Sequence, residues 1–426
     1  MSTDLLALYK SCNRTICTDT RKISPGSLFV ALKGERFNGN KFVEQALTTG
    51  AKHALIDEAE YHIEGKTTLV DDALKALQEL AHAYRNTFSI PIIGITGSNG
   101  KTTSKELITA VLAKRYRVHA TPGNFNNHIG LPLTLLSMPE DTEIAILEMG
   151  DNHPGEIDFL SQIGAPTHGL ITNVGKDHIE GFGSFENNKL AKKELFDYLV
   201  NHDGELFVPT FETDLLPLVP NGAREVRFGS PEDRFSLQFT GSSPFVRYMD
   251  SQGTETTSQL IGDYNFKNIE MAYALGMYFE VEAQNIHEAI AEYRPSNNRS
   301  QYLEKGEHVI FLDAYNANPS SVELALESFV KQNLKEHRIV ILGDMLELGE
   351  ESLSEHQGIV DQIKTLDIQA LLVGQEFGQT KLSEKMKAFA DRHELMDYLK
   401  ANPLPGSQLL IKGSRGIRLE EVLEIW

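Results

Sequence analysis

Cysteine is nearly absent from this chain of 426 residues. The two cysteines, Cys12 and Cys17, do not form a CxxC pair and are too few for a disulfide framework. No apolar run reaches the roughly 18 residues of a membrane-spanning helix, and the N-terminal segment MSTDLLALYKSCNR has no cationic region ahead of an apolar one. We therefore expect a cytoplasmic protein without a signal peptide or a membrane span.

Positive charge is also scarce, with 40 Lys and Arg against 60 Asp and Glu and a net charge of −20. No long basic run is present that could neutralise a row of phosphates, which argues against nucleic acid and anionic membranes as partners. A small anionic substrate stays possible, because local Lys and Arg side chains and helix N-termini can hold it.

The hydrophobic (41%) and charged (23%) fractions are those of a folded globular chain, and the length corresponds to about three domains. Residues 27–32 and 54–56 read as short strands between Gly-rich turns, which indicates a small α/β unit. Asp71 and Asp72 then open a helical pattern that ends near Pro91. We expect this helix to lead into a second domain.

Strand and helix patterns alternate from Pro91 onward, which predicts parallel sheets. Residues 204–262 are richer in strand and turn patterns, and the alternation resumes after about residue 296. We predict an α/β protein with domains at 1–84, 85–296 and 297–426, the last of them Rossmann-like. The expected strands and helices lie at 92–95, 102–112, 144–147, 170–173, 187–199, 308–312, 322–330, 338–342, 370–373, 408–411 and 419–423.

The strongest local signal is the segment TGSNGKTT, residues 96–103, between an apolar strand and a helix. Glycines let backbone N–H groups turn around phosphate oxygens, while Lys101 can reach the β and γ phosphates and the Thr102 hydroxyl can ligate Mg²⁺. The strict P-loop pattern GxxxxGK[ST] has glycine at the position that Ile95 occupies in this chain, so the segment is a variant of that loop. It predicts a nucleotide-binding site.

Polar side chains follow two further strands. Glu148 ends the strand at 144–147, at the sheet edge where a second metal contact of a P-loop site belongs. The segment NVGKDH, which ends at His178, follows the strand at 170–173, although one histidine is more often structural than a metal ligand. The lysines of the helix at 187–199 would ordinarily face solvent; they are Lys189, Lys192 and Lys193.

With these pieces in order, the chain resembles the Mur ligases, the ATP-dependent amide-forming enzymes of bacterial cell-wall precursor synthesis. The resemblance rests on TGSNGKTT, the EMG of residues 148–150, NVGKDH and the Ala191-Lys192 step, and it covers nearly the whole chain. Further stretches are similar to the family member that attaches D-Ala-D-Ala. They are TPGNFNNHIGLP (121–132), NHPGEI (152–157), HIEGFGS (178–184), DAYNANP (313–319), GDMLELG (343–349) and KGSR (412–415).

The resemblance implies a UDP-substrate unit, a central P-loop ATPase with a parallel sheet and a C-terminal Rossmann-like unit that closes over the nucleotide. It implies two Mg²⁺ ions, one held by Thr102 and Glu148 and the other by His178 and a carbamylated Lys192. Lys101, Lys192 and His178 would then be catalytic. The implied nucleotide contacts are Gly97, Ser98, Asn99, Gly100, Lys101, Thr102, Thr103, Asn265, Asn268, Arg299, Asp313, Tyr315 and Asn316, and the implied substrate contacts are Thr20, Ser27, Asn124, Asn126 and Asn127.

The reaction implied is phosphoryl transfer from ATP to the terminal carboxylate of UDP-MurNAc-tripeptide, followed by attack of D-Ala-D-Ala on the acyl phosphate. A monomer is expected. Alternatives are the family member that adds the third peptide residue, a folylpolyglutamate synthetase, a P-loop switch or motor, and a non-catalytic nucleotide-binding module. A switch would need neither the DAYNANP segment nor the N-terminal segment at 19–34.

Overall fold

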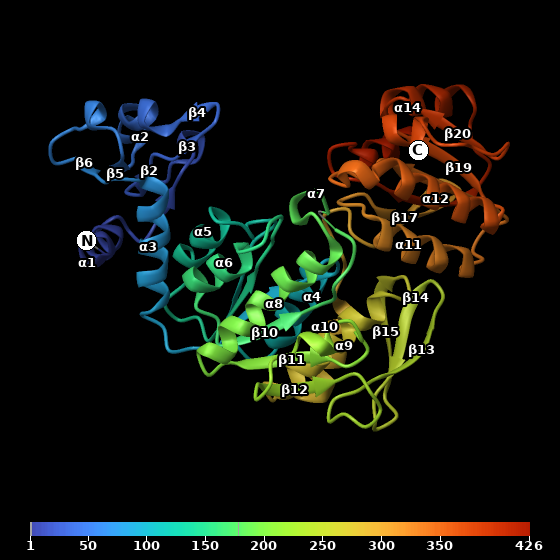
Figure 1. Ribbon diagram of the computed structural model, residues 1–426, viewed down its shortest axis with the longest axis horizontal. Helices are drawn as coiled ribbons and strands as arrows, with labels where there is room; N and C mark the ends of the chain where they lie inside the picture. The colour runs from blue at the N-terminus through green and yellow to red at the C-terminus, as the bar shows by residue number, and fades with distance from the viewer. Residues whose placement is uncertain (1, 178) are drawn as a thin grey trace.

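A computed structural model describes residues 2–177 and 179–426, and its three α/β units follow one another along the chain (Figure 1). The N-terminal unit (blue) and the C-terminal unit (red) lie on either side of the central unit (green to yellow). In the part of the chain that is described, no helix is both long and apolar enough to cross a membrane.

The N-terminal unit is built on a parallel four-stranded sheet of order β1-β2-β5-β6. The strand expected at 27–32 is shorter, because the chain turns after Val30 into the β3–β4 hairpin. The elements are α1 (Ser2–Ser11), β1 (Ile16–Cys17), β2 (Leu28–Val30), β3 (Lys33–Gly34), β4 (Phe37–Asn38), α2 (Val43–Thr49), β5 (His53–Ile56), β6 (Thr67–Leu69) and α3 (Ala73–Arg85), with 3₁₀ turns at Thr20–Lys22, Gly39–Phe42 and Ala59–Tyr61.

Helix α3 joins the N-terminal unit to the central unit and confirms the helix expected after Asp72. The Asp72 side chain accepts a hydrogen bond from the Lys75 backbone N–H and so caps the helix N-terminus. Leu77 and Leu80 are fully buried and belong to the same apolar cluster as residues of α1 and of the central unit. The N-terminal sheet is therefore carried on a helix that is packed into the neighbouring unit.

Arg85, at the end of α3, connects this helix to the end of α6 in the central unit. Its buried guanidinium donates hydrogen bonds to the carbonyls of Gly164 and Ala165, at the C-terminus of α6 (Glu156–Gly164), and to that of Phe88. Desolvation lowers the pKa of Arg85, so these carbonyls must compensate a buried cation.

We expect Arg85→Met to lower the free energy of unfolding by about 2–4 kcal/mol, because buried carbonyls would lose their donors. Urea denaturation measures the change. Arg36→Met, at an exposed position, is the control and should shift the free energy by less than about 0.5 kcal/mol. Equal effects of the two substitutions would contradict the anchoring role.

The central unit contains a parallel six-stranded sheet of order β12-β11-β10-β7-β9-β8 and an antiparallel sheet of order β13-β14-β15. Its five strands within residues 204–262 agree with the strand-rich composition there. The remaining elements are β7 (Ile92–Thr96), α4 (Lys101–Leu112), β8 (Val118–Ala120), α5 (Gly130–Leu136), β9 (Ile144–Glu148), β10 (His168–Ile171), α7 (Ile179–Phe182), α8 (Phe185–Asn201), β11 (Glu205–Pro209), β12 (Arg224–Phe228), β13 (Gln238–Ser242), β14 (Phe245–Met249), β15 (Glu255–Ile261), α9 (Asn265–Tyr278) and α10 (Ala283–Glu292), with a 3₁₀ turn at Leu216–Leu218.

The parallel sheet of the central unit is covered on both faces, as alternation along its strands requires. In β9, Ala145 and Leu147 pack with residues of α5, α6 and α8, whereas Ile144 and Ile146 pack with residues of α4 and α9. Both layers hold the sheet rigidly, so the loops that follow the strands start from fixed points. The strand expected at 170–173 ends at Ile171, and Asn173 therefore lies in the following loop.

The C-terminal unit is a six-stranded sheet of order β16-β17-β21-β18-β19-β20, parallel except for β16. The helix expected at 419–423 is a 3₁₀ helix, and its buried Leu419 and Val422 match the period of three residues. The elements are β16 (Gln301–Lys305), β17 (His308–Asp313), α11 (Pro319–Lys331), β18 (His337–Gly343), α12 (Ser352–Leu366), β19 (Gln369–Val373), α13 (Gln375–Gly378), β20 (Met386–Phe389), α14 (Arg392–Ala401), β21 (Ser407–Lys412) and the 3₁₀ helices Gly349–Glu351 and Leu419–Ile425.

Ion pairs join the central and C-terminal units. Lys331 of α11 lies 2.8 Å from Asp263, and Lys176, in the loop after β10, lies 2.8 Å from Glu355 of α12. The pair with Glu355 gives Lys176 a role in joining the two units, which could not be seen from its place in the sequence. The first pair holds α11 and the second holds α12 against the central unit, and α11 lies on the side of the C-terminal unit that faces the central unit (Figure 1).

Candidate functional site

The glycine loop between β7 and α4 has a backbone that other residues would not fit. Gly97 has φ +135°, and a Cβ there would lie 2.1 Å from Thr172 Oγ1. Gly100, with φ +80°, would place a Cβ 2.5 Å from Asn268 Oδ1. The loop therefore lies directly against α9 and against Thr172, the residue after β10, while other residues of the loop line a cleft. This arrangement suits a phosphate-binding turn at a helix N-terminus.

Lys101 is the first residue of α4, and its side chain folds back over the loop. Its Nζ donates hydrogen bonds to the carbonyls of Gly97 and Ser98. Desolvation is the main cause that lowers the pKa of Lys101 from its usual value. The ammonium therefore lies at the loop, where it donates to two loop carbonyls, in the position from which a lysine can reach bound phosphates.

Glu148 ends β9 and faces the same loop. Its carboxyl is 2% exposed; Oε1 accepts hydrogen bonds from Thr102 Oγ1 at 3.2 Å and from Asn126 Nδ2 at 2.9 Å. Oε2 accepts no hydrogen bond from the described residues, although Lys105 Nζ lies 3.2 Å away. The acidic side chain thus contacts both the P-loop helix and the predicted substrate loop.

The donor set around Glu148 suits Mg²⁺. Magnesium takes octahedral oxygen ligands at about 2.0–2.1 Å, which places adjacent ligands about 2.9 Å apart. The Thr102 hydroxyl and Glu148 Oε1 are 3.2 Å apart and could become such neighbours with little movement. Among residues 2–177 and 179–426, no group of three His, Cys, Asp or Glu side chains could hold a metal, so other oxygen donors must complete the coordination.

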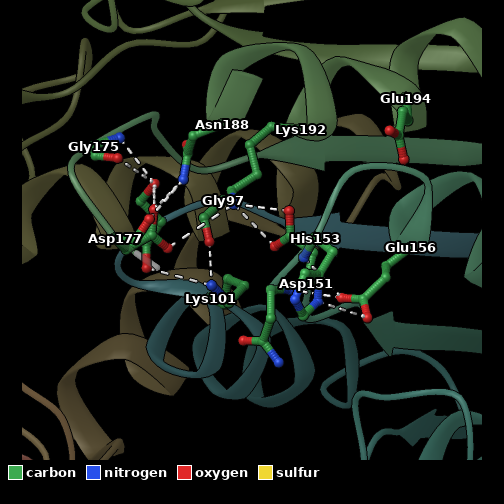
Figure 2. A network of polar contacts seen from close by, with 12 residues as sticks. Gly97, Lys101, Asp151, His153, Glu156, Gly175, Asp177, Asn188, Lys192 and Glu194 are labelled. Atoms are coloured by element: carbon green, nitrogen blue, oxygen red, sulfur yellow. Dashed lines mark hydrogen bonds and ion pairs between the residues drawn. The ribbon is translucent and has the colours of Figure 1, made fainter. Parts of the chain in front are cut away.

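Lys192 of α8 does not face solvent, contrary to the ordinary interpretation of a helix lysine. It is fully buried, and its Nζ donates hydrogen bonds to both carboxylate oxygens of Asp151, at 2.8 and 2.9 Å (Figure 2). Asp177 Oδ2 lies 3.9 Å away. These two carboxylates stabilise the ammonium form of the side chain.

The other lysines of α8 have ordinary surroundings. Lys189 pairs with Asp214 at 3.0 Å, and Lys193 pairs with Asp197 one turn further along α8. The predicted catalytic and metal-binding residue His178 lies outside the described residues. Its neighbour Asp177 is buried and accepts hydrogen bonds from Ser98 Oγ at 2.6 Å and from Asn188 Nδ2 at 2.7 Å (Figure 2).

The C-terminal unit reaches the P-loop directly. Asn318, which caps the N-terminus of α11, donates a hydrogen bond from Nδ2 to Asn99 Oδ1 at 2.9 Å. Lys412 lies 2.6 Å from Asp313 and donates a hydrogen bond to the Asn316 carbonyl. The predicted residues of this unit are therefore held by internal contacts in front of the loop.

The remaining predicted nucleotide contacts come from α9 and from the connection between the central and C-terminal units. Asn268 donates a hydrogen bond to Asn265 Oδ1 and accepts one from Ser104 Oγ of α4, which ties α9 to α4. The guanidinium of Arg299, in the connection between the units, stacks 3.7 Å from the centre of the Tyr315 ring.

A cleft of about 1370 Å³ brings most of these residues together. Among the predicted residues, its walls include Ser98, Asn99, Gly100, Lys101, Thr102, Thr103, Asn124, Asn126, Asn127, Glu148, Asn265, Asn268, Arg299, Asp313, Tyr315 and Asn316.

The cleft walls do not include Gly97, Lys192, Thr20 or Ser27. Gly97 lies at the base of the loop, and Lys192 lies behind Asp151, which does form part of the wall. Thr20 and Ser27 belong to the N-terminal unit, in the 3₁₀ turn and just before β2.

Three residues near the site have contacts that their places in the sequence do not reveal. They are Lys105, Asp151 and Asn318, which contact Glu148, Lys192 and Asn99 respectively. Lys105 could have been suspected from its place one helical turn after Lys101. Nothing local connects Asp151 with Lys192, because the two residues meet only through the packing of α8 against the loop after β9.

Family models match most of the chain. The Mur ligase family, catalytic domain model matches residues 14–85, the Mur ligase middle domain model matches residues 95–276, and the Mur ligase, glutamate ligase domain model matches residues 298–415.

Whole proteins give the same picture. The chain is 37% identical to the UDP-N-acetylmuramoyl-tripeptide–D-alanyl-D-alanine ligase of Bacillus subtilis, over 96% of this chain and 92% of that protein. It is 34% identical to the protein of the same name from Escherichia coli, over 96% and 92% of the two chains. The crystal structure of the MurF ligase of Thermotoga maritima in complex with ADP superposes with a TM-score of 0.84 and 26% identity, covering 99% of this chain and 97% of that one.

Proposed function

The chain belongs to the Mur ligase family, and on that premise we propose that it is the ATP-dependent ligase that joins D-Ala-D-Ala to UDP-MurNAc-tripeptide. The match over nearly the full length to ligases named for this reaction supports the choice of substrates. The use of ATP is supported by one observation: a single cleft brings the P-loop together with Glu148 and with residues of the C-terminal unit.

In this proposal, the tripeptide carboxylate attacks the γ-phosphorus of ATP and forms an acyl phosphate and ADP. The free amine of D-Ala-D-Ala then attacks the acyl carbon, and phosphate leaves as the amide forms. Lys101 binds the phosphates, while Thr102 and Glu148 hold one Mg²⁺. Such an ion neutralises the charge of the transferring phosphoryl group. Asn124, Asn126 and Asn127 hold the substrate near that carboxylate, and Thr20 and Ser27 lie in the unit for its UDP end.

Lys192 is proposed as a carbamate that joins His178 in binding a second Mg²⁺. The ammonium first loses one proton, and the neutral amine then adds to CO₂ and releases a second, so that a cation becomes an anion on a long stem. The complete burial of Lys192 supports this role, since a solvated surface lysine would have no such environment. For the carbamate to form, Lys192 must first leave Asp151, its present ion-pair partner.

The setting proposed is the cytoplasm, where a monomeric enzyme would supply peptidoglycan precursors and so support cell shape and division. Domain boundaries at 84/85 and 296/297 remain part of the proposal. A ligase for the third peptide residue and a folylpolyglutamate synthetase are less well supported, because the full-length relatives above carry the name of the D-Ala-D-Ala ligase.

ATP turnover tests this proposal. With ATP, UDP-MurNAc-tripeptide and D-Ala-D-Ala together, we expect ADP, phosphate and one new amide in equal amounts. The tripeptide carboxylate accepts the phosphoryl group to form the acyl phosphate, and the dipeptide amine accepts the acyl group and releases phosphate. Phosphate release is measured while each acceptor is omitted in turn. A P-loop switch would instead hydrolyse ATP without the dipeptide, and steady turnover in the absence of the nucleotide sugar would rule out the ligase.

A further inference from the structure

Lys105 is a buried lysine with no role in the chemistry described so far. It lies on α4 one turn after Lys101, is 3% exposed and points toward the end of β9. Its Nζ lies 3.2 Å from Glu148 Oε2 and donates a hydrogen bond to the Gly123 carbonyl at 3.4 Å. The ammonium therefore sits between the proposed metal ligand and the substrate loop.

The carboxylate of Glu148 already has its charge neutralised by this contact. One oxygen accepts hydrogen bonds from Thr102 and Asn126, and the other faces Lys105. Both partners of the ion pair are nearly inaccessible to water, so each needs the other as a counter-ion. The neighbouring carboxylate in the cleft wall, Asp151, is paired with a lysine of its own.

We propose that Lys105 is an internal counter-ion of Glu148 that prevents a divalent cation from binding there alone, so that the first Mg²⁺ enters only together with the nucleotide phosphates. This inference rests on the nucleotide site proposed above. Lys105 is thus a positioning residue, since it acts on the metal through Glu148.

The charge balance supports this order of binding. A dication at Glu148 would meet one carboxylate and, close by, the ammonium groups of Lys105 and Lys101. In the described part of the chain, no cluster of three acidic or histidine ligands could offset that repulsion. The polyphosphate of a nucleotide supplies the missing negative charge and oxygen ligands together. Metal and nucleotide should therefore strengthen each other's binding.

Binding of Mn²⁺ to the full-length protein, followed by electron paramagnetic resonance, tests the proposal without any turnover. For the wild type, we expect ADP to strengthen Mn²⁺ binding at this site at least about tenfold, after correction for the Mn²⁺–ADP complex in solution. Lys105→Gln should bind Mn²⁺ alone at least about tenfold more tightly than the wild type, because a nearby positive charge is gone. Glutamine keeps a donor for the Gly123 carbonyl.

Two further variants locate the effect. Lys114→Gln removes a lysine whose partners, Glu288 and Glu292, belong to α10, and it should leave Mn²⁺ binding unchanged. Lys105→Gln combined with Glu148→Gln should lose the tenfold gain if the added metal is bound at Glu148.

The proposal is overturned if wild-type protein binds Mn²⁺ alone as tightly as with ADP, or if folded Lys105→Gln shows no gain. Should Lys105→Gln fail to fold, equal affinities of the wild type for Mn²⁺ with and without ADP would still overturn the proposal. Failure of the ligase assay alongside these binding results would refute the proposed substrates and leave the role of Lys105 standing.

Discussion

Lys101→Ala is expected to lower kcat by about a thousandfold or more, which corresponds to about 4 kcal/mol of lost transition-state stabilisation. The Lys101 ammonium lies at the mouth of the glycine loop and lines the cleft, where negative charge shifts during phosphoryl transfer. Alanine would leave the loop backbone in place but remove the charge. Release of ADP at saturating ATP and substrates measures the loss.

The fold should tolerate Lys101→Ala, because this lysine donates hydrogen bonds to two loop carbonyls and belongs to none of the apolar clusters of the described residues. Thermal unfolding of the variant should therefore stay close to that of the wild type. Lys114→Ala, just beyond the same helix, serves as the matched control and should keep normal turnover. A Lys101→Ala enzyme with near-normal kcat would refute the assignment of this loop to phosphate binding.

Lys192→Ala is expected to abolish activity, because no other buried side chain of α8 could become the proposed carbamate ligand. Lys193→Ala should remain active, since Lys193 pairs with Asp197 on its own helix. Exhaustive removal of CO₂ should slow the wild type reversibly, and returning bicarbonate should restore the rate. A fully active Lys192→Ala enzyme would overturn the assignment.

Loss of activity in Lys192→Ala needs a control for folding, because the substitution leaves Asp151 buried without its counter-ion. Combining Lys192→Ala with Asp151→Asn removes both charges and should restore much of the lost stability without restoring activity. Recovery of turnover in the double variant would mean that Lys192 only compensates Asp151. The response to CO₂ provides a second, independent readout, because a purely structural lysine would not respond to it.

The local parts of this molecule could be predicted from the sequence. The glycine loop at 96–103, its helix and the buried strand that ends at Glu148 follow from residue types and short-range periodicity, and the structure has them there. Where an expected element differs from the structure, the difference lies at its ends or, at Leu419–Ile425, in its being a 3₁₀ helix. These ends depend on weak local preferences that neighbouring contacts easily shift.

Partnerships between distant residues could not be predicted in this way. Asn318 meets Asn99 across 219 positions, and Lys176 meets Glu355 across 179. Each bond depends on how the C-terminal unit is placed against the central sheet, which no repeat or spacing in the sequence records. The polar character of these residues was visible, but their partners were not.

The sequence by itself determined the residue types that a phosphate loop needs and their order along the chain, because loop and helix conformations depend on near neighbours. Only the tertiary structure decided which carboxylates pair with the lysines of the site. Lys105 and Lys192 have the sequence positions of ordinary helix lysines, which usually face solvent. Packing against the sheet buries both side chains, so that Lys105 pairs with Glu148 and Lys192 pairs with Asp151. Burial removes water from these ions, and the choice of counter-ion then depends on which elements the fold brings together.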